Sequence, residues 1–154
     1  VGVTAGKTLA FALGKPVVPV DSLRVLLANV DEAGAAAAAP VIDARLGQVY
    51  AAIFDLPART PVLSDFVGTA RELRPNLPPG AVVFGDATAR YRDEFAGFTI
   101  GPAAWSQPRA EAVARLGAET FRAGGGVAPD DLVPRYLRAS DAERRRRERH
   151  GHAP

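Results

Sequence analysis

Short apolar segments alternate along the chain with polar, glycine-rich and proline-rich stretches, and their spacing predicts an α/β protein. Residues 2–13 are apolar or small on almost every side, which predicts a helix that Gly14 ends. Residues 17–20 predict a short strand between prolines. After them, Asp21 and Ser22 can cap a second helix, because apolar positions then recur three and four residues apart.

Residues 41–54 carry the strongest strand signal. Two apolar runs, rich in β-branched and aromatic residues, flank a polar corner at Asp43–Arg45 that is closed by Leu46–Gln48. This pattern predicts a β-hairpin in which the chain reverses at Gly47. The preceding alanine run, 35–39, predicts a linker or the extension of a helix.

The second half of the chain continues the alternation of strands and helices. A helix at 108–122 has the clearest amphipathic pattern, with an apolar stripe that includes Val113, Leu116 and Phe121. Strands between helices, together with a hairpin, indicate a mixed sheet in an α/β domain. The other expected elements are a helix from Ser64 to Leu73, a buried strand at 81–84, a helix at 87–95, a short strand at 98–100 and an extended segment at 129–138.

Length and charge narrow the class of protein. At 154 residues the chain can form one compact domain with a real core. Residues 139–154 hold five arginines against three acidic residues, which leaves 14 basic and 14 acidic residues in 1–138. We therefore expect a basic, flexible tail at 139–154 and a folded part without the positive charge that nucleic-acid binding requires.

The sequence also gives an expectation for the cellular compartment of the protein and for the start of the chain. The chain has no apolar run long enough to cross a bilayer and no signal-peptide pattern, so we expect a cytoplasmic protein without a membrane partner. The absence of cysteine excludes disulfides and thiolate zinc sites. Because the chain lacks methionine and opens on Val1-Gly2-Val3, we expect a fragment that begins part-way through its domain.

A phosphate-binding loop is suggested by Gly6-Lys7-Thr8 but not supported. The motif needs a glycine five positions earlier, where Val1 stands, and a strand before it. We interpret Lys7 instead as one polar residue on an apolar helix. A helix that is apolar all round must be buried all round, either as an internal core helix or by packing one face on its own sheet and its small-residue face on another helix.

The remaining candidates for chemistry are three isolated carboxylates, Asp43, Asp55 and Asp86. We expect Asp43 to satisfy turn amides and pair locally with Arg45, and Asp86 to cap a helix. The histidines, His150 and His152, lie in the tail, too far from any serine of the folded part to activate it. No self-contained active site or metal site is predicted.

Five segments, in order, resemble motifs of the TsaB (YeaZ-like) family. The hairpin Asp43-Ala44-Arg45-Leu46-Gly47-Gln48-Val49-Tyr50 is similar to the family's "DARxGxVY", and this is the best match. The others are residues 1–10 with "GxRxGxxxAKxLA", 15–23 with "GxPLxGVSSLxAL", 83–86 with the strand end "xxGxG", and 134–138 with the closing "PxYLR".

The resemblance implies the two-lobed actin/Hsp70-like ATPase fold (ASKHA, RNase H-like). Residues 1–34 would be the C-terminal part of the first lobe and 35–138 the second lobe, since the family's "DTS" strand, first helix and "GPGSFTGxR" loop are missing. The "HxxxH" metal motif of the TsaD branch is absent too.

The family further implies a non-catalytic partner subunit in the synthesis of the tRNA modification threonylcarbamoyladenosine (t6A). It would pair with a TsaD-like catalytic subunit and work with a TsaE-like ATPase. It would meet tRNA only through the complex, bind no cofactor alone, and form a homodimer where the partner is absent. The hairpin motif residues are Asp43, Arg45, Gly47 and Tyr50, and the expected partner interface is Val1, Val3, Ala5, Lys7, Thr8 and Ala12.

An alternative is a fragment of an ATP-dependent sugar or acyl kinase of the same fold. There the Asp43–Gly47 corner would hold a phosphate and the Gly85 turn an adenosine. Such proteins need glycines at both contacts, where this chain has Ala44 and Asp86, so we rank the kinase below the partner subunit.

Overall fold

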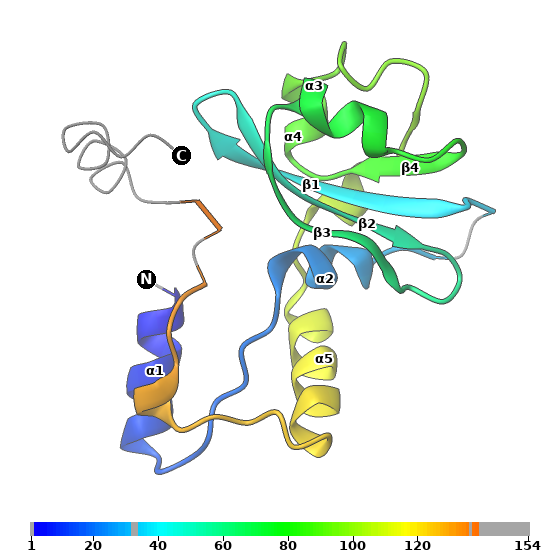
Figure 1. Cartoon of the computed structure of the whole chain (residues 1–154). Helices are drawn as coiled ribbons and strands as arrows, with labels where there is room; N and C mark the ends of the chain where they lie inside the picture. Colours follow the sequence, from blue (N-terminus) through cyan, green and yellow to red (C-terminus); the bar gives the residue numbers. More distant parts are fainter. Residues whose placement is uncertain (1, 32–33, 136, 139–154) are drawn as a thin grey trace.

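The chain folds around one mixed five-stranded sheet, seen in a computed structural model that describes residues 2–31, 34–135 and 137–138 (Figure 1). The strand order is β3-β2-β1-β4-β5. Strand β2 is antiparallel to both of its neighbours, β1 and β3, whereas β4 runs parallel to β1 and to β5. The mixed sheet is therefore confirmed. The strands are β1 (Ala37–Arg45), β2 (Gln48–Asp55), β3 (Pro61–Gly68), β4 (Ala81–Phe84) and β5 (Thr99–Ile100).

Short helices cover both faces of this sheet, while two longer helices extend from it (Figure 1). Within the described residues no helix combines the length and the apolar character that crossing a bilayer requires. The helices are α1 (Gly2–Ala12), α2 (Ser22–Leu27), α3 (Ala70–Leu73), η1 (Arg74–Asn76), α4 (Ala87–Arg90), η2 (Ala103–Ser106), α5 (Ala110–Arg122) and η3 (Pro129–Asp131).

Two hydrophobic clusters hold these layers together. On one face of the sheet, Ile53 and Leu73 belong to a cluster with α3 and α4. On the other face, Leu26 of α2 and Phe84 of β4 pack with Trp105 of η2, whose ring meets Phe84 edge-on at 5.7 Å between centroids. A sheet covered on both faces explains why β4 is a continuous apolar run.

The last three alanines of the run belong to the central strand, so the prediction of a linker or helix extension at 35–39 was wrong for residues 37–39. Ala37–Ala39 begin β1 and pair with both β2 and β4. Ala39 faces one hydrophobic cluster and Ala38 the other, and both are fully buried. Small side chains suit this position because covering elements approach from both sides.

The helix predicted from Ser64 to Leu73 was also wrong in its first half. Residues 61–68 form β3, and α3 begins only after Thr69. Thr69 and Glu72 form a capping box, in which the Thr69 backbone N–H donates to Glu72 Oε2 at 2.7 Å and the Glu72 N–H donates to Thr69 Oγ1 at 3.2 Å. The bonds from the Thr69 backbone and hydroxyl lower the pKa of Glu72.

Smaller differences concern the ends of elements. The strand expected at 17–20 reduces to an isolated bridge between Val17 and Val127. The helix expected at 87–95 ends after Arg90 and continues as turns. The long helix is confirmed as α5, but Val113 and Phe121 of its apolar stripe are exposed. The tail at 139–154 lies outside the described residues.

Candidate functional site

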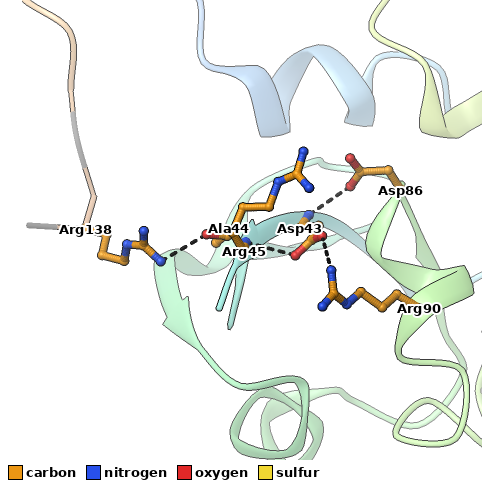
Figure 2. A network of polar contacts seen from close by, with 6 residues as sticks. All are labelled: Asp43, Ala44, Arg45, Asp86, Arg90 and Arg138. Atoms are coloured by element: carbon orange, nitrogen blue, oxygen red, sulfur yellow. Dashed lines mark hydrogen bonds and ion pairs between the residues drawn. The ribbon is translucent and has the colours of Figure 1, made fainter. Parts of the chain in front are cut away.

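A polar cluster lies where the parallel strands β1 and β4 end (Figure 2). The backbone N–H of Asp43 donates to Asp86 Oδ1 at 2.9 Å, and Asp43 Oδ2 accepts from Arg90 Nη1 at 3.1 Å. The Asp43 side chain is only 16% exposed, so this ion pair is partly shielded from solvent. Asp86 stands at the start of α4 but makes no capping bond, so the predicted cap was wrong. Its carboxylate binds the end of β1 instead.

Gly85 allows these two strand ends to approach each other. Its φ is +125°, and a Cβ at this position would lie 2.0 Å from the Val41 carbonyl oxygen. The Gly85 N–H donates to Ser106 Oγ at 3.0 Å, and its carbonyl accepts from Thr88 Oγ1 at 2.8 Å. Only glycine fits here, because any side chain would collide with the backbone of β1.

The hairpin reverses as the sequence predicted, at Leu46 and Gly47. Both have positive φ, +52° and +78°, in the two-residue loop between the paired residues Arg45 and Gln48. Asp43 accepts from the backbone N–H of Arg45 at 2.9 Å, so its local turn bond is confirmed. The ion pair expected with Arg45 is made with Arg90 instead, and the Arg45 guanidinium points away from Asp43 (Figure 2).

The other hairpin residue, Tyr50, is half-buried in β2 between Ile42 and Val67. It lies within the sheet and away from the polar cluster's contacts. Its position therefore indicates a role in packing β1 and β3.

The polar cluster holds the ends of β1 and β4 together through hydrogen bonds and an ion pair. Asp43 accepts from two donors, and Asp86 accepts from the backbone of β1. Asp55, the third candidate carboxylate, accepts from the Thr60 N–H at 2.6 Å in a turn. In the part of the chain that the structure describes, no three carboxylate or histidine side chains gather as metal ligands would.

Helix α1 presents an apolar face that the described residues leave uncovered. It packs chiefly against η3, and Ala10 is its one buried residue. Leu9, Phe11 and Leu13 are 62%, 68% and 61% exposed. The prediction that this helix is buried on all sides, as a core helix or against its own sheet, is therefore wrong for the chain in isolation.

The expected interface residues divide between the two faces of α1. Successive residues of a helix turn by about 100°, so Ala5, Thr8 and Ala12 share the exposed face. Lys7 lies on the opposite face, where its Nζ donates to the carbonyl of Asp130 in η3 at 3.0 Å. Val3 lies on the η3 side as well and is 40% exposed, and Val1 lies outside the described residues.

Two arginines of the closing segment at 134–138, for which the sequence predicts no contact, bind distant elements. Arg135 Nη2 donates to Asp21 Oδ2 at 3.3 Å and to Asp65 Oδ1 at 2.7 Å. Arg138 Nη1 donates to the carbonyl of Ala44 at 3.1 Å (Figure 2). The sequence features that could have pointed to these contacts are the "PxYLR" segment, which contains Arg135 and Arg138, and the place of Arg90 one helical turn after Asp86.

Comparisons with known proteins identify the family. A family model described as TsaD, tRNA N6-adenosine threonylcarbamoyltransferase, matches residues 1–145. The tRNA threonylcarbamoyladenosine biosynthesis protein TsaB of Bacillus subtilis (strain 168) is 33% identical over 159 residues, covering 93% of this chain and 65% of the relative. The chain thus spans slightly less than two thirds of this relative's length.

Two solved structures from Pseudomonas aeruginosa are similar in fold. A protein described as similar to the peptidase YEAZ has a TM-score of 0.69 and 25% identity, over 89% of this chain and 66% of its own. YeaZ has a TM-score of 0.66 and 23% identity, over 87% of this chain and 65% of its own. With the TsaD match, these likenesses confirm the actin/Hsp70-like (ASKHA) fold. The chain therefore belongs to the family that the TsaD model describes, which has the ASKHA fold, and within it is similar to the TsaB and YeaZ proteins.

Proposed function

We propose that this protein is a non-catalytic partner subunit in t6A biosynthesis that supports a TsaD-like catalytic subunit. The name of its Bacillus subtilis relative supports the pathway, and the match to the TsaD model supports a partner built on the same fold. The observation that carries the proposal is the uncovered apolar face of α1. A surface of this kind on a small protein marks a site of protein–protein contact.

The exposed face of α1 is suited to another helix. Ala5, Thr8 and Ala12 form a small-residue stripe along it, with Leu9 and Phe11 at its sides. Small residues allow two helix axes to approach closely, and the flanking large side chains fill the grooves of the facing helix. The inner face is already occupied, since Lys7 binds η3. The interface that we propose is therefore Ala5, Thr8 and Ala12, joined by Leu9 and Phe11.

Co-purification with a TsaD-like subunit tests this interface. Ala5→Arg combined with Ala12→Arg places two charges on the stripe and should abolish the pairing while the chain stays folded, because both positions are exposed. Ala114→Arg is the matched control, since it introduces the same change on an exposed position of α5. Full pairing by the Ala5/Ala12 variant, or an equal loss with Ala114→Arg, would refute the assignment.

The non-catalytic part of the proposal rests on the polar cluster. Its carboxylates make structural hydrogen bonds, and Ala44 and Asp86 stand where the kinase alternative needs glycine. Calorimetric titration of the chain with Mg-ATP should give only the heat of dilution. A dissociation constant in the micromolar range, about −8 kcal/mol, would instead favour the kinase.

The remaining partners follow from the same assignment. We propose that a TsaE-like ATPase and tRNA meet the assembled complex and not this chain alone. Where the TsaD-like subunit is absent, the stripe on α1 can pack against the same stripe of a second copy, giving a homodimer. Sedimentation over a range of concentrations would measure this, and the Ala5/Ala12 variant should remain monomeric.

A further inference from the structure

The closing segment connects two parts of the molecule that otherwise share few contacts. Helix α1 and η3 form one unit, the α1–η3 unit, held by the Lys7 contact to Asp130 and by packing. The sheet with its covering helices forms the other (Figure 1). Residues 132–135 lead from η3 back towards the sheet, and Arg135 is the residue of this stretch that binds it.

Arg135 binds two different layers of the sheet unit at once. Asp21 is the N-cap of α2, where its Oδ1 accepts from the Arg24 N–H at 3.0 Å. Helix α2 is itself fixed, because Leu23, Val25, Leu26 and Leu27 are all buried. The other carboxylate, Asp65, belongs to the edge strand β3.

The backbone of β3 is shaped to present Asp65. Its φ is +56°, a left-handed conformation that aspartate tolerates better than most side chains. Leu63, two residues before it, and Phe66, directly after it, pack against the hydrophobic cluster of the sheet. Asp65 is therefore set outwards from a fixed strand, at 2.7 Å from the guanidinium.

We propose that Arg135 is a positioning residue that fixes the angle of the α1–η3 unit against the sheet. By this means it sets the direction in which the exposed face of α1 meets a partner helix. The inference deepens the proposed function at the same surface and rests on it for its biological role. The ion pairs themselves can be tested without any partner.

Both ion pairs of Arg135 are accessible to solvent, so their strength should depend on the salt concentration. The Arg135 side chain is 62% exposed, and its two partners are 35% and 44% exposed. Salt screens exposed pairs of this kind, so high ionic strength should loosen the unit. Packing between apolar groups would not respond in this way.

A distance measurement by pulsed electron paramagnetic resonance tests the proposal directly. The chain has no cysteine, so Thr4→Cys in α1 and Val62→Cys in β3 provide two unique, exposed positions for spin labels. The parent distance distribution should be narrow at low salt and broaden at high salt. Arg135→Ala should be broad at both, and Arg135→Lys should recover part of the narrow distribution, because its ammonium keeps the charge and three donors.

Two controls separate positioning from general loosening. Arg115→Ala removes an ion pair of similar exposure, to Glu119 at 3.1 Å within α5, and should leave the distribution narrow. Exchanging the charges, with Arg135→Asp and Asp65→Arg together, should restore part of the narrow distribution relative to Arg135→Asp alone, because the pair between positions 65 and 135 forms again while Asp21 then faces a carboxylate. An unchanged distribution in Arg135→Ala, or equal broadening in Arg115→Ala, overturns the proposal.

Partner binding provides the second readout. Arg135→Ala should weaken binding to a TsaD-like subunit about three- to tenfold, as expected from losing one or two exposed ion pairs. If the parent chain does not bind, the proposed function fails while the distance measurement still decides the role of Arg135. If the distribution broadens and binding is unchanged, Arg135 orders the unit without positioning it for the partner, and the inference is wrong.

Discussion

Replacing Gly85 by alanine tests how the polar cluster is built. The new Cβ would lie 2.0 Å from the Val41 carbonyl oxygen and 2.8 Å from its carbon, both backbone atoms that no rotamer change can move. The turn at Gly85 cannot easily move away from β1, because its N–H and its carbonyl are hydrogen-bonded to Ser106 and Thr88. The end of β4 must therefore separate from β1.

The expected destabilisation has two parts. A side chain at φ +125° costs about 1–3 kcal/mol in backbone conformation. Forcing an added methyl group into a packed site typically costs about 1–3 kcal/mol more. We therefore expect Gly85→Ala to lower the free energy of unfolding by about 2–6 kcal/mol, with the hydrogen bond from Asp43 to Asp86 lost as the strands separate.

Gly97→Ala is the matched control for the conformational part. Gly97 has φ +90°, and a Cβ there would meet nothing within 4 Å. This variant should lose only about 1–2 kcal/mol. Urea denaturation followed by circular dichroism gives both values, and with a slope of about 2 kcal/mol/M the Gly85 variant should unfold about 1–3 M earlier than the parent. Equal midpoints for the two variants would refute the steric argument.

Three further outcomes can be measured on the same chain. Ala39→Leu should lower the free energy of unfolding by about 1–3 kcal/mol, because this side chain is fully buried in the sheet, whereas a linker alanine would tolerate the change. Arg59→Ala should cost about 1–3 kcal/mol in the same assay, because its guanidinium donates to the carbonyls of Leu27 and Val30 at the end of α2, at 3.2 and 2.7 Å. The lowered pKa of Glu72 means that its contribution to stability is complete above its ordinary value of 4.5 and is lost as the pH falls through the folded-state pKa, so Glu72→Gln should remove this part of the acid dependence in a pH series of unfolding curves.

The elements that the sequence predicted best are those with a strong local signal. The hairpin has β-branched and aromatic residues on both arms and a glycine at the reversal, and the structure pairs Ile42 with Tyr50 as this pattern requires. Strand β4 is a four-residue apolar run ended by Gly85, and α5 has the amphipathic period of a helix. In each case the residue pattern that predicts the element lies within the element itself.

The two wrong predictions of secondary structure, at 37–39 and from Ser64, concern strands that lack the regular alternation of apolar and polar residues. A strand buried on both faces has no period of two, so Ala37–Ala39 could not be told from a low-complexity linker. In β3 the register shifts opposite Ile53, and Asp65 takes a positive φ. These irregularities break the alternation that marks a strand, and Ser64 is a residue type that caps helices, so a helix was predicted from Ser64.

The polar contacts depend on the fold and could not be predicted from spacing. Arg90 lies 47 residues from Asp43, and Arg135 lies 114 residues from Asp21. The carboxylates were recognised as candidates because aspartate at a turn or a strand end is a local signal. Their cationic partners become neighbours only once β1, β4 and the closing segment are in place.

Helix α1 is the point at which the sequence and the isolated chain disagree, and the disagreement is informative. An apolar residue on every side of a helix predicts burial on every side. The structure buries one side against η3 and leaves Leu9 and Phe11 in solvent. A sequence that keeps such residues exposed bears a cost in solubility that no contact within the described residues offsets. A second chain that covers this face would resolve the conflict, and for that reason we propose the interface on α1 and not on the hairpin, where the best family match lies.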